Sequence, residues 1–559
     1  MSLAENKKTE IPKKKVFIIG LDGATFDLIR PWVDAGKLPA LSRLMEQGTY
    51  GVLKSVVPPF TAPAWASFLT GKAPESHGIF FFLNRNEKDY HLVPSNSSRI
   101  QGQDLGSIIS RHHRRVALVN VPVTYPPRPV NGIVVSGLGT PGQHSRFTYP
   151  DHLREQLISK YDYEVERTRR YHTGIEKEFI STVNRVEEKR FRAVRYLMET
   201  TDWDLFSVVF RGTDILGHAL WRFMDQTHAK YEPDLHKIYG QALLEHYQMM
   251  DNFISDIWRR LDEDTTLIVM SDHGMGPLHR YVYLDGMFYD WGLLKIKPGF
   301  ISRLKLVLFK HGLAPHNIID FLTKTGLREW IRKHLSRQKT WKAGLKLFRL
   351  DIDWERTLAY PFSSTNLIYL NVAGRDPQGI VKPGEEYERL VKYITSKLLK
   401  LRDPLTGDLL VEKVLRKEEI YPGNCVTHTP DLWVQWKDDR YTAMSGYSSR
   451  NISEILREPS GTHTMSGIFL AAGSGIKNGD KVDNASIIDI APTALHIMGE
   501  PVPVDMDGQV LKEIFKSGSV EDRQPAYEGE SMSGENDFKF TDTEKSMIEK
   551  RLRDLGYLA

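Results

Sequence analysis

Cysteine is nearly absent from this sequence, since Cys425 is the single one among 559 residues. One cysteine excludes an intramolecular disulfide framework. A chain without disulfides suits a reducing compartment, so we expect a cytoplasmic protein.

Long apolar runs are missing as well. The first apolar segment, residues 16–21, is too short for the apolar part of a signal peptide or for a membrane span. No later segment reaches about eighteen uninterrupted apolar residues. We therefore expect no transmembrane helix.

The third absence is an excess of one charge sign. The formal net charge is only +4, which implies no general affinity for polyanions and no specific nucleic-acid binding.

The length of the chain bears on its domain organisation. At 559 residues it exceeds one simple core, so we expect one large catalytic domain with insertions, or two to three domains.

Apolar segments that end in polar residues recur along the chain. They are predicted as buried strands at residues 16–21, 115–121, 132–136, 205–210, 266–271 and 466–472. Continuous apolar strands of this kind are typical of a parallel sheet that is covered on both faces. Helical patterns alternate with them, at residues 26–35, 39–47, 177–200 and 241–261. The alternation predicts an α/β sandwich with a largely parallel central sheet.

Breaks in this alternation suggest the domain organisation. We expect a flexible N-terminus at 1–14, and a discontinuous catalytic core at 15–290 and 451–515 with a helical excursion at about 140–200. A cap insertion would occupy 291–450, as a basic helical part (291–350) and an α+β part (351–450). A flexible linker and a C-terminal helix, predicted at 541–555 with Thr541 or Thr543 as its cap, would fill 516–559.

The basic part of the cap is amphipathic. From residue 301 to 350 there are twelve Lys or Arg, against only Asp320 and Glu329. Such a stretch is an ordinary solvated face, or it attracts an anionic substrate or an anionic membrane. Contact with an anionic membrane through 301–350 is therefore one hypothesis.

A proline-rich turn holds the candidate nucleophile. Pro58, Pro59 and Pro63 surround Thr61 and fix the backbone, so we predict a stiff, non-helical turn at Thr61 with a helix beginning just after it, near Pro63. A hydroxyl at a helix N-terminus is an N-cap, or it lies where backbone N–H groups favour an anion.

Carboxylates and imidazoles follow several of the predicted strands. Since the ligand crevice of such sheets lies at the carboxyl ends of the strands, we expect these residues near one edge. Asp214 and His218 are spaced one helical turn apart on one face. The set is Asp22, Asp214, His218, Asp272, His273 and His463.

Together these residues resemble the alkaline phosphatase superfamily, in particular its type I phosphodiesterase/nucleotide pyrophosphatase family. The similarity covers about residues 14–515, with the cap regions diverging. It rests on Leu21-Asp22-Gly23, Thr61-Ala62-Pro63, Thr70-Gly71, Pro74-Glu75-Ser76-His77-Gly78-Ile79, Asp214 with His218, Ser271-Asp272-His273-Gly274, and His463. The resemblance implies an alkaline-phosphatase-like sandwich.

The resemblance also implies roles. Asp22, Thr61, Asp272 and His273 would hold one metal ion; Asp214, His218 and His463 would hold the second. Carboxylate and imidazole ligands suit Zn²⁺ most, with Mn²⁺ as the alternative. Thr61 would be the nucleophile of a double displacement through a phosphothreonine intermediate.

The sequence departs from the family at the substrate side. Nucleotide-hydrolysing members carry a phosphate-binding Asn two to three residues after the His-Gly-Ile turn, where this chain has Phe80-Phe81-Phe82. Asn84 is the substitute candidate, and Arg211 is a second candidate for substrate binding. The substrate expected is a small phosphorylated molecule: a nucleotide, a lipid head group or another phosphodiester.

Other functions stay open at this point. A phosphomonoesterase or a phosphonate hydrolase of the same superfamily is one alternative. A membrane-surface or anion-binding protein that retains the fold is another. Sulfatases need Cys or Ser within a Cys/Ser-x-Pro-x-Arg motif, whereas this chain has Thr61-Ala62-Pro63-Ala64-Trp65. This difference disfavours a sulfatase.

Overall fold

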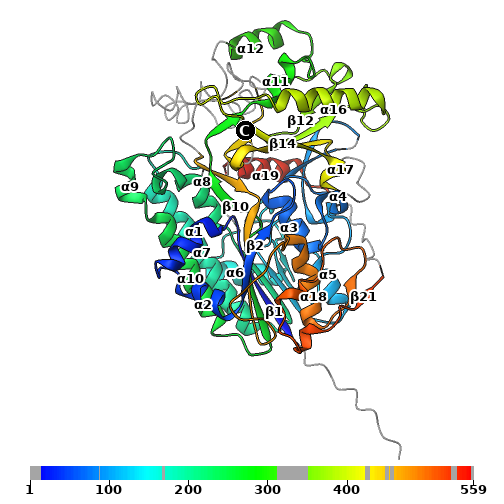
Figure 1. The fold of residues 1–559 in the computed structure, drawn as a ribbon. Coiled ribbons are helices and arrows are strands. Elements are labelled where there is room, and N and C mark those ends of the chain that lie inside the picture. The colour runs from blue at the N-terminus through cyan, green and yellow to red at the C-terminus, as the bar shows by residue number, and fades with distance from the viewer. Residues whose placement is uncertain are drawn as a thin grey trace, which may run out of the picture.

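The computed structural model describes residues 14–86, 88–165, 170–310, 351–421, 429–446, 452, 459–529 and 538–554. Its centre is a nine-stranded sheet of order β19-β2-β18-β9-β1-β8-β5-β6-β7 (Figure 1). The strands are β1 (Lys15–Leu21), β2 (Thr49–Lys54), β5 (Val116–Val119), β6 (Gly132–Val135), β7 (Thr148–Tyr149), β8 (Leu205–Phe210), β9 (Thr265–Met270), β18 (Ser466–Ala472) and β19 (Asp480–Lys481).

The predicted α/β fold with a largely parallel sheet is confirmed. Strands β9, β1, β8, β5 and β6 run parallel to one another. The prediction was wrong for β18, which pairs antiparallel with both β9 and β2. A strand covered on both faces is apolar throughout whichever way it runs, so its sequence does not show its direction.

Helices cover both faces of the sheet, as predicted (Figure 1). On β1, Phe17 and Ile19 point into one apolar cluster, whereas Val16 and Ile18 point into the other. The first cluster is covered by α1 (Phe26–Asp34), α2 (Pro39–Gln47), α7 (Glu176–Thr200), α8 (Gly212–Met224) and α10 (Ala242–Trp258). The second is covered by α3 (Thr61–Thr70), α5 (Leu105–Arg111) and α18 (Ile490–Met498). No helix among the described residues is long and apolar enough to cross a bilayer.

The helical stretch at 140–200 joins the core more closely than an excursion would. It supplies the edge strand β7, helix α6 (His152–Tyr161) and α7, which packs against α8 and α10. On α7, Glu187 is buried and accepts the backbone N–H groups of Arg211 and Gly212, both at 2.8 Å. This helix therefore supports the start of α8.

The cap has its own four-stranded sheet of order β12-β13-β15-β14. Its strands are β12 (Ala359–Pro361), β13 (Leu367–Leu370), β14 (Val411–Arg416) and β15 (Leu432–Trp436). Helix α11 (Leu284–Asp290) leads into it, and its own helices are α12 (Phe300–Lys310), α16 (Glu385–Leu398) and α17 (Lys417–Ile420). The rest of the predicted basic helical part, residues 311–350, lies outside the described residues.

The predicted flexible linker after residue 516 is partly wrong. Residues Val520–Asp522 form a 3-10 turn, and β21 (Tyr527–Glu528) pairs in parallel with β20 (Val502–Pro503). Helix α19 (Asp542–Asp554) begins as predicted: Thr541 Oγ1 accepts the Glu544 N–H at 3.2 Å, and Glu544 Oε2 accepts the Thr541 N–H at 2.9 Å.

Shorter elements surround the sheet edge. They are α4 (Pro74–His77), β3 (Leu83–Arg85), β4 (Leu92–Pro94), α9 (Pro233–Tyr239), β10 (Gly274–Pro277), β11 (Arg280–Val282), β16 (Tyr441–Ala443) and β17 (Gly461–Thr464). The hairpin of β3 and β4 joins core and cap, because Arg85 forms a buried ion pair with Asp376 and donates to Tyr360 Oη at 2.7 Å. Beside it the Tyr90 ring stacks on Trp354, with centroids 3.8 Å apart.

We predict that Arg85→Met destabilises the protein by about 3 kcal/mol, because it leaves a buried carboxylate without its main partner. The loss is at the low end of the usual range because Arg375 still reaches Asp376, at 3.1 Å. Urea denaturation followed by tryptophan fluorescence measures it. The control is Arg115→Met, which removes the exposed pair with Asp202 and is expected to cost about 1 kcal/mol or less. Equal losses in the two variants would contradict the prediction.

Candidate active site

Six charged or imidazole side chains meet at one edge of the sheet. Asp22 follows β1, Asp272 and His273 follow β9, and Asp214 and His218 lie on α8, which follows β8. His463 arrives from the other direction, on β17, which pairs antiparallel with β10 and sets His463 opposite Met275. The structure thus brings the predicted ligands into two groups: Asp22, Asp272 and His273, and Asp214, His218 and His463.

The first group lies beside Thr61. Nε2 of His273 is 3.2 Å from Asp272 Oδ2 and 3.6 Å from Asp22 Oδ1. The same Nε2 is 3.3 Å from the Thr61 hydroxyl oxygen. All of these residues are fully buried. Thr61 therefore lies beside the three other residues that the resemblance implies for the first ion, and its role as a ligand stays a prediction.

In the second group, Asp214 Oδ1 lies 3.2 Å from Nε2 of both His218 and His463. The two Nε2 atoms are 2.9 Å apart. The two groups adjoin each other, since the rings of His273 and His463 stack with centroids 3.7 Å apart.

Each imidazole is oriented by a backbone carbonyl. Nδ1 of His218 lies 2.8 Å from Gly461 O, Nδ1 of His273 lies 3.0 Å from Gly274 O, and Nδ1 of His463 lies 3.0 Å from Pro59 O. A carbonyl oxygen can only accept a hydrogen bond, so Nδ1 carries the proton and donates. Each ring then turns Nε2 toward the centre of its group, as metal-binding histidines do. Burial lowers the pKa of His218, but the Asp214 carboxylate outweighs this effect and raises it, so a bound cation would take the place of the Nε2 proton there.

In each of the three carboxylates, one oxygen contacts a donor of the protein and the other faces the centre of its group. Arg211 Nε donates to Asp22 Oδ2 at 2.9 Å, and its Nη2 lies 3.7 Å from Asp214 Oδ2. Asp272 Oδ1 accepts the Gly23 N–H at 3.1 Å. The other oxygen of each carboxylate, Oδ1 of Asp22 and Asp214 and Oδ2 of Asp272, faces the imidazoles.

Burial disfavours the charged forms of these side chains when no cation is bound. Desolvation, and then the neighbouring Asp214 charge, raise the pKa of Asp22 to about 7. Desolvation and the charge of Asp22 raise the pKa of Asp272 well above its usual range. Burial would also raise the pKa of Asp214, but His218 and His463 hold it well below the usual value. Burial lowers the pKa of His273 and of His463 to about 4, so both rings are neutral at pH 7.

A pair of divalent cations fits these side chains. Among the described residues, no donor forms a hydrogen bond with Asp22 Oδ1 or Asp272 Oδ2, although both atoms are buried. A cation in each group would take up the inward oxygens and the Nε2 lone pairs together. The donor set contains only carboxylate, imidazole and hydroxyl groups, which suits Zn²⁺ or Mn²⁺ and does not distinguish them.

Thr61 is placed by the start of α3. The helix begins at Thr61 itself, with Phe60 as the extended N-cap residue, so the predicted helix start near Pro63 was two residues late. Pro63 still lies in the first turn, where a missing N–H breaks no helical bond. Helix α3 is buried along its whole length, and the Trp65 ring occupies the space where a Cβ on Gly20 of β1 would stand.

Comparison with known families identifies the chain. The sequence profile described as type I phosphodiesterase / nucleotide pyrophosphatase matches residues 16–466. The chain belongs to this family. Membership indicates a hydrolase of phosphoester bonds. The predicted family is therefore confirmed.

A solved bacterial structure with a TM-score above 0.5 agrees on the fold. Phosphonoacetate hydrolase from Sinorhizobium meliloti 1021 aligns with a TM-score of 0.52 and 15% identity, over 87% of this chain and 96% of that one. Human ectonucleotide pyrophosphatase / phosphodiesterase 5 aligns over 90% of this chain and 100% of that one, with a TM-score of 0.47 and 12% identity. A comparison with curated proteins gave no match.

The two residues predicted to contact the substrate, Asn84 and Arg211, both contact other groups of the protein. Asn84 lies on β3, where its Nδ2 is 3.4 Å from Gly78 O and its Oδ1 is 3.5 Å from the Phe80 N–H, so its amide contacts its own turn. Arg211 is fully buried between Asp22 and Asp214. Its guanidinium orients two carboxylates, which is a contact that the sequence analysis did not foresee. Substrate binding by either residue stays a prediction.

Sequence reasoning also missed the supports of the Thr61 loop. The Tyr421 hydroxyl, from the cap, donates to Val57 O at 2.6 Å, and its ring lies edge-on to Phe80 with centroids 6.1 Å apart. The Ser55 hydroxyl donates to Asp272 O at 2.6 Å. Backbone carbonyls leave no mark in a sequence, so these bonds had no signal there.

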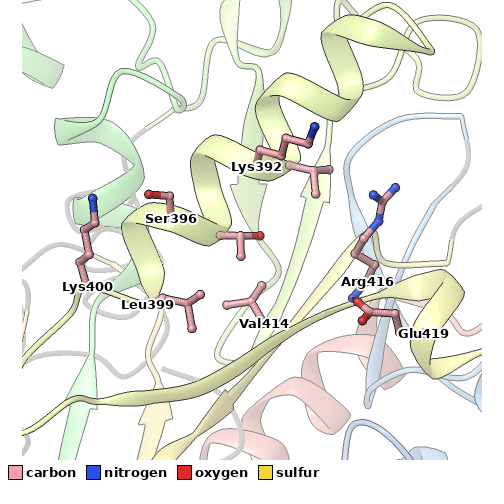
Figure 2. Close-up of a pocket in the computed structure, with 9 residues that line it drawn as sticks. Lys392, Ser396, Leu399, Lys400, Val414, Arg416 and Glu419 are labelled. Atoms are coloured by element: carbon pink, nitrogen blue, oxygen red, sulfur yellow. The ribbon is translucent and has the colours of Figure 1, made fainter.

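A separate cavity of about 510 Å³ lies on the cap, between α16 and β14 (Figure 2). Its lining includes Lys392, Leu399, Lys400, Val414 and Arg416, and none of the metal-group residues. Arg416 is already paired with Glu388, at 2.7 and 2.8 Å. This groove is not the candidate active site.

We predict that the wild-type protein, loaded with Zn²⁺ or Mn²⁺ and then desalted, holds two ions per chain. Asp272→Asn is expected to lose one ion and His463→Ala the other, because each removes a donor from one group. Inductively coupled plasma mass spectrometry measures the content.

Asp251→Asn is the matched control. This carboxylate is also buried, but its two oxygens accept the N–H groups of Ala40 and Leu41 at 2.9 and 2.8 Å, outside both groups. The control variant should keep both ions. A wild-type protein without bound ions, or full content in all variants, would refute the assignment.

Proposed function

We propose that this protein is a two-metal phosphodiesterase of the pyrophosphatase type that acts through a phosphothreonine intermediate on Thr61. The observation that supports it most is the position of the Thr61 hydroxyl, 3.3 Å from His273 Nε2 and at the N-terminus of the buried helix α3. Asp22, Thr61, Asp272 and His273 would hold one ion, and Asp214, His218 and His463 the other. Zn²⁺ is the first candidate and Mn²⁺ the second.

Bound there, the two cations would stabilise negative charge on the attacking and the leaving oxygen. The residues of the chain account for the rest. Thr61 Oγ1 attacks phosphorus as it loses its proton to solvent, the bond from phosphorus to the leaving alcohol breaks, and the alcohol departs with the electron pair and takes up a proton. Water then attacks phosphorus, the bond from phosphorus to Thr61 Oγ1 breaks, Oγ1 takes up a proton, and the phosphomonoester departs.

Helix α3 contributes to both steps. The Ala62 N–H belongs to its first turn, where helical hydrogen bonding does not use it. This group and the helix dipole favour negative charge on the non-bridging oxygens of the phosphoryl group. The buried packing of Trp65 against Gly20 holds this helix end in place.

The proposed substrate rests on the family and not on a contact in the site. Family membership supports a phosphodiester or pyrophosphate bond, and a nucleotide, a lipid head group or another small phosphodiester would each supply one. A phosphomonoester or a phosphonate is the alternative within the superfamily. Hydrolysis of bis-p-nitrophenyl phosphate, p-nitrophenyl phosphate and a phosphonate monoester separates them. We expect the diester to be preferred, EDTA to abolish turnover, and Zn²⁺ or Mn²⁺ to restore it.

Thr61→Ala is expected to lower kcat for the diester by roughly 10³–10⁶-fold, the range seen when a catalytic nucleophile is removed. The metal content should stay near that of the wild type, since two carboxylates and an imidazole remain in its group. Steady-state kinetics on metal-loaded protein measures the change.

The matched control is Thr70→Ala at the other end of α3. The Thr70 hydroxyl is also buried, but it donates to Ala66 O at 2.8 Å. That variant should stay within about tenfold of wild type. Retained activity in Thr61→Ala would show that the nucleophile is another group. Absence of turnover on every ester, with metal bound, would favour the anion-binding alternative.

A further inference from the structure

Helix α12 exposes four large apolar side chains. Phe300, Leu304, Val307 and Leu308 are 81%, 46%, 52% and 38% exposed. Their spacing of four, seven and eight residues puts them on one face of the helix. A soluble protein normally buries such a face, and a contiguous exposed stripe of large apolar side chains marks an interaction surface.

Cations flank this apolar stripe. At 100° per residue, Arg303 lies beyond one side of the stripe and Lys305 beyond the other, and Lys297 stands just before the helix. The helix sequence contains no acidic residue. Long cationic side chains beside an apolar stripe are typical of helices that lie in the plane of a membrane interface, where the charges reach the head groups.

The helix is mounted at the outer end of the cap (Figure 1). Its approach is fixed by a bridge between Ile296 and Ile352, with the Lys297 N–H donating to Asp351 O at 2.8 Å. The Arg303 N–H donates to Gly299 O at 3.0 Å and so ties the first turn to the preceding segment. The helix therefore stands away from the central sheet, and its four large apolar side chains are exposed there.

We propose that α12 docks this protein on an anionic lipid surface, with the apolar stripe in the interface and Arg303 and Lys305 on the head groups. Charge favours this occupant, because the whole stretch from 301 to 350 has twelve Lys or Arg and two acidic residues. A second copy of the chain is less suited, because like charges would meet and four side chains are far fewer than the roughly 20 residues a side of a stable protein interface. The docking is independent of the proposed chemistry.

Co-sedimentation with vesicles tests it on the full chain. We expect the wild type to bind vesicles of phosphatidylcholine with about 30% phosphatidylserine, but not phosphatidylcholine alone, and to bind more weakly in high salt. The double variant Phe300→Ser, Leu304→Ser should lower the partition coefficient at least tenfold. Arg303→Glu should lower it as well, through charge alone.

The matched control is Ile238→Ser on α9, because Ile238 is 67% exposed and lies outside the cap. It should bind as the wild type does. All variants should keep the circular dichroism spectrum and the rate on soluble bis-p-nitrophenyl phosphate. Failure of the wild type to bind phosphatidylserine vesicles would overturn the proposal, and so would equal binding by the double variant. Self-association in analytical ultracentrifugation that the double variant abolishes, without vesicle binding, would assign the stripe to a second copy instead.

Discussion

Three buried carboxylates within reach of one another are the constraint on which the rest of this structure depends. Asp22, Asp214 and Asp272 are removed from water, and the pKa values of Asp22 and Asp272 rise because burial and the neighbouring charges disfavour ionisation. Such a cluster of buried carboxylates is stable only if positive charge compensates it. Arg211 supplies one positive charge on the outer oxygens. The inner oxygens and three Nε2 atoms are left to face each other, which is the arrangement of a site built for cations.

The fold satisfies this constraint through the backbone as much as through side chains. Parallel strands β1, β8 and β9 end at one edge, so residues 189 or more positions apart in the chain meet there. Strand β18 runs the other way, which brings the ribbon of β10 and β17, and with it His463, to the same edge. The carbonyls of Gly461, Gly274 and Pro59 then fix the three rings. Pro59 lies two residues before Thr61, so its contact with His463 joins the segment of the first group that holds Thr61 to the second group.

The sequence predicts features that depend on the type of side chain, and it does not predict features that depend on the backbone. Apolar runs and the polar residues after them located six of the strands and the residues that meet in the two groups, because burial and the chemistry of charged side chains both restrict residue type. Strand direction is not encoded in this way, and β18 was therefore misassigned. The start of α3 at Thr61 depends on the extended backbone of Phe60, and the Tyr421 contact depends on where the cap folds back. The polar composition after residue 516 suggested a linker, yet β21 is ordered there by backbone pairing that composition does not show.

The cap is tied to the core at two points that border the candidate site. The Arg85 ion pair adjoins Asn84 in sequence, and the Tyr421 hydroxyl holds the loop that leads to Thr61. Because both ties are buried or directional, the cap cannot shift freely without moving the hairpin of β3 or the Thr61 loop. Docking at the outer end of the cap, at α12, would therefore place core and cap on the surface as one body, without changing the position of Thr61 in the core.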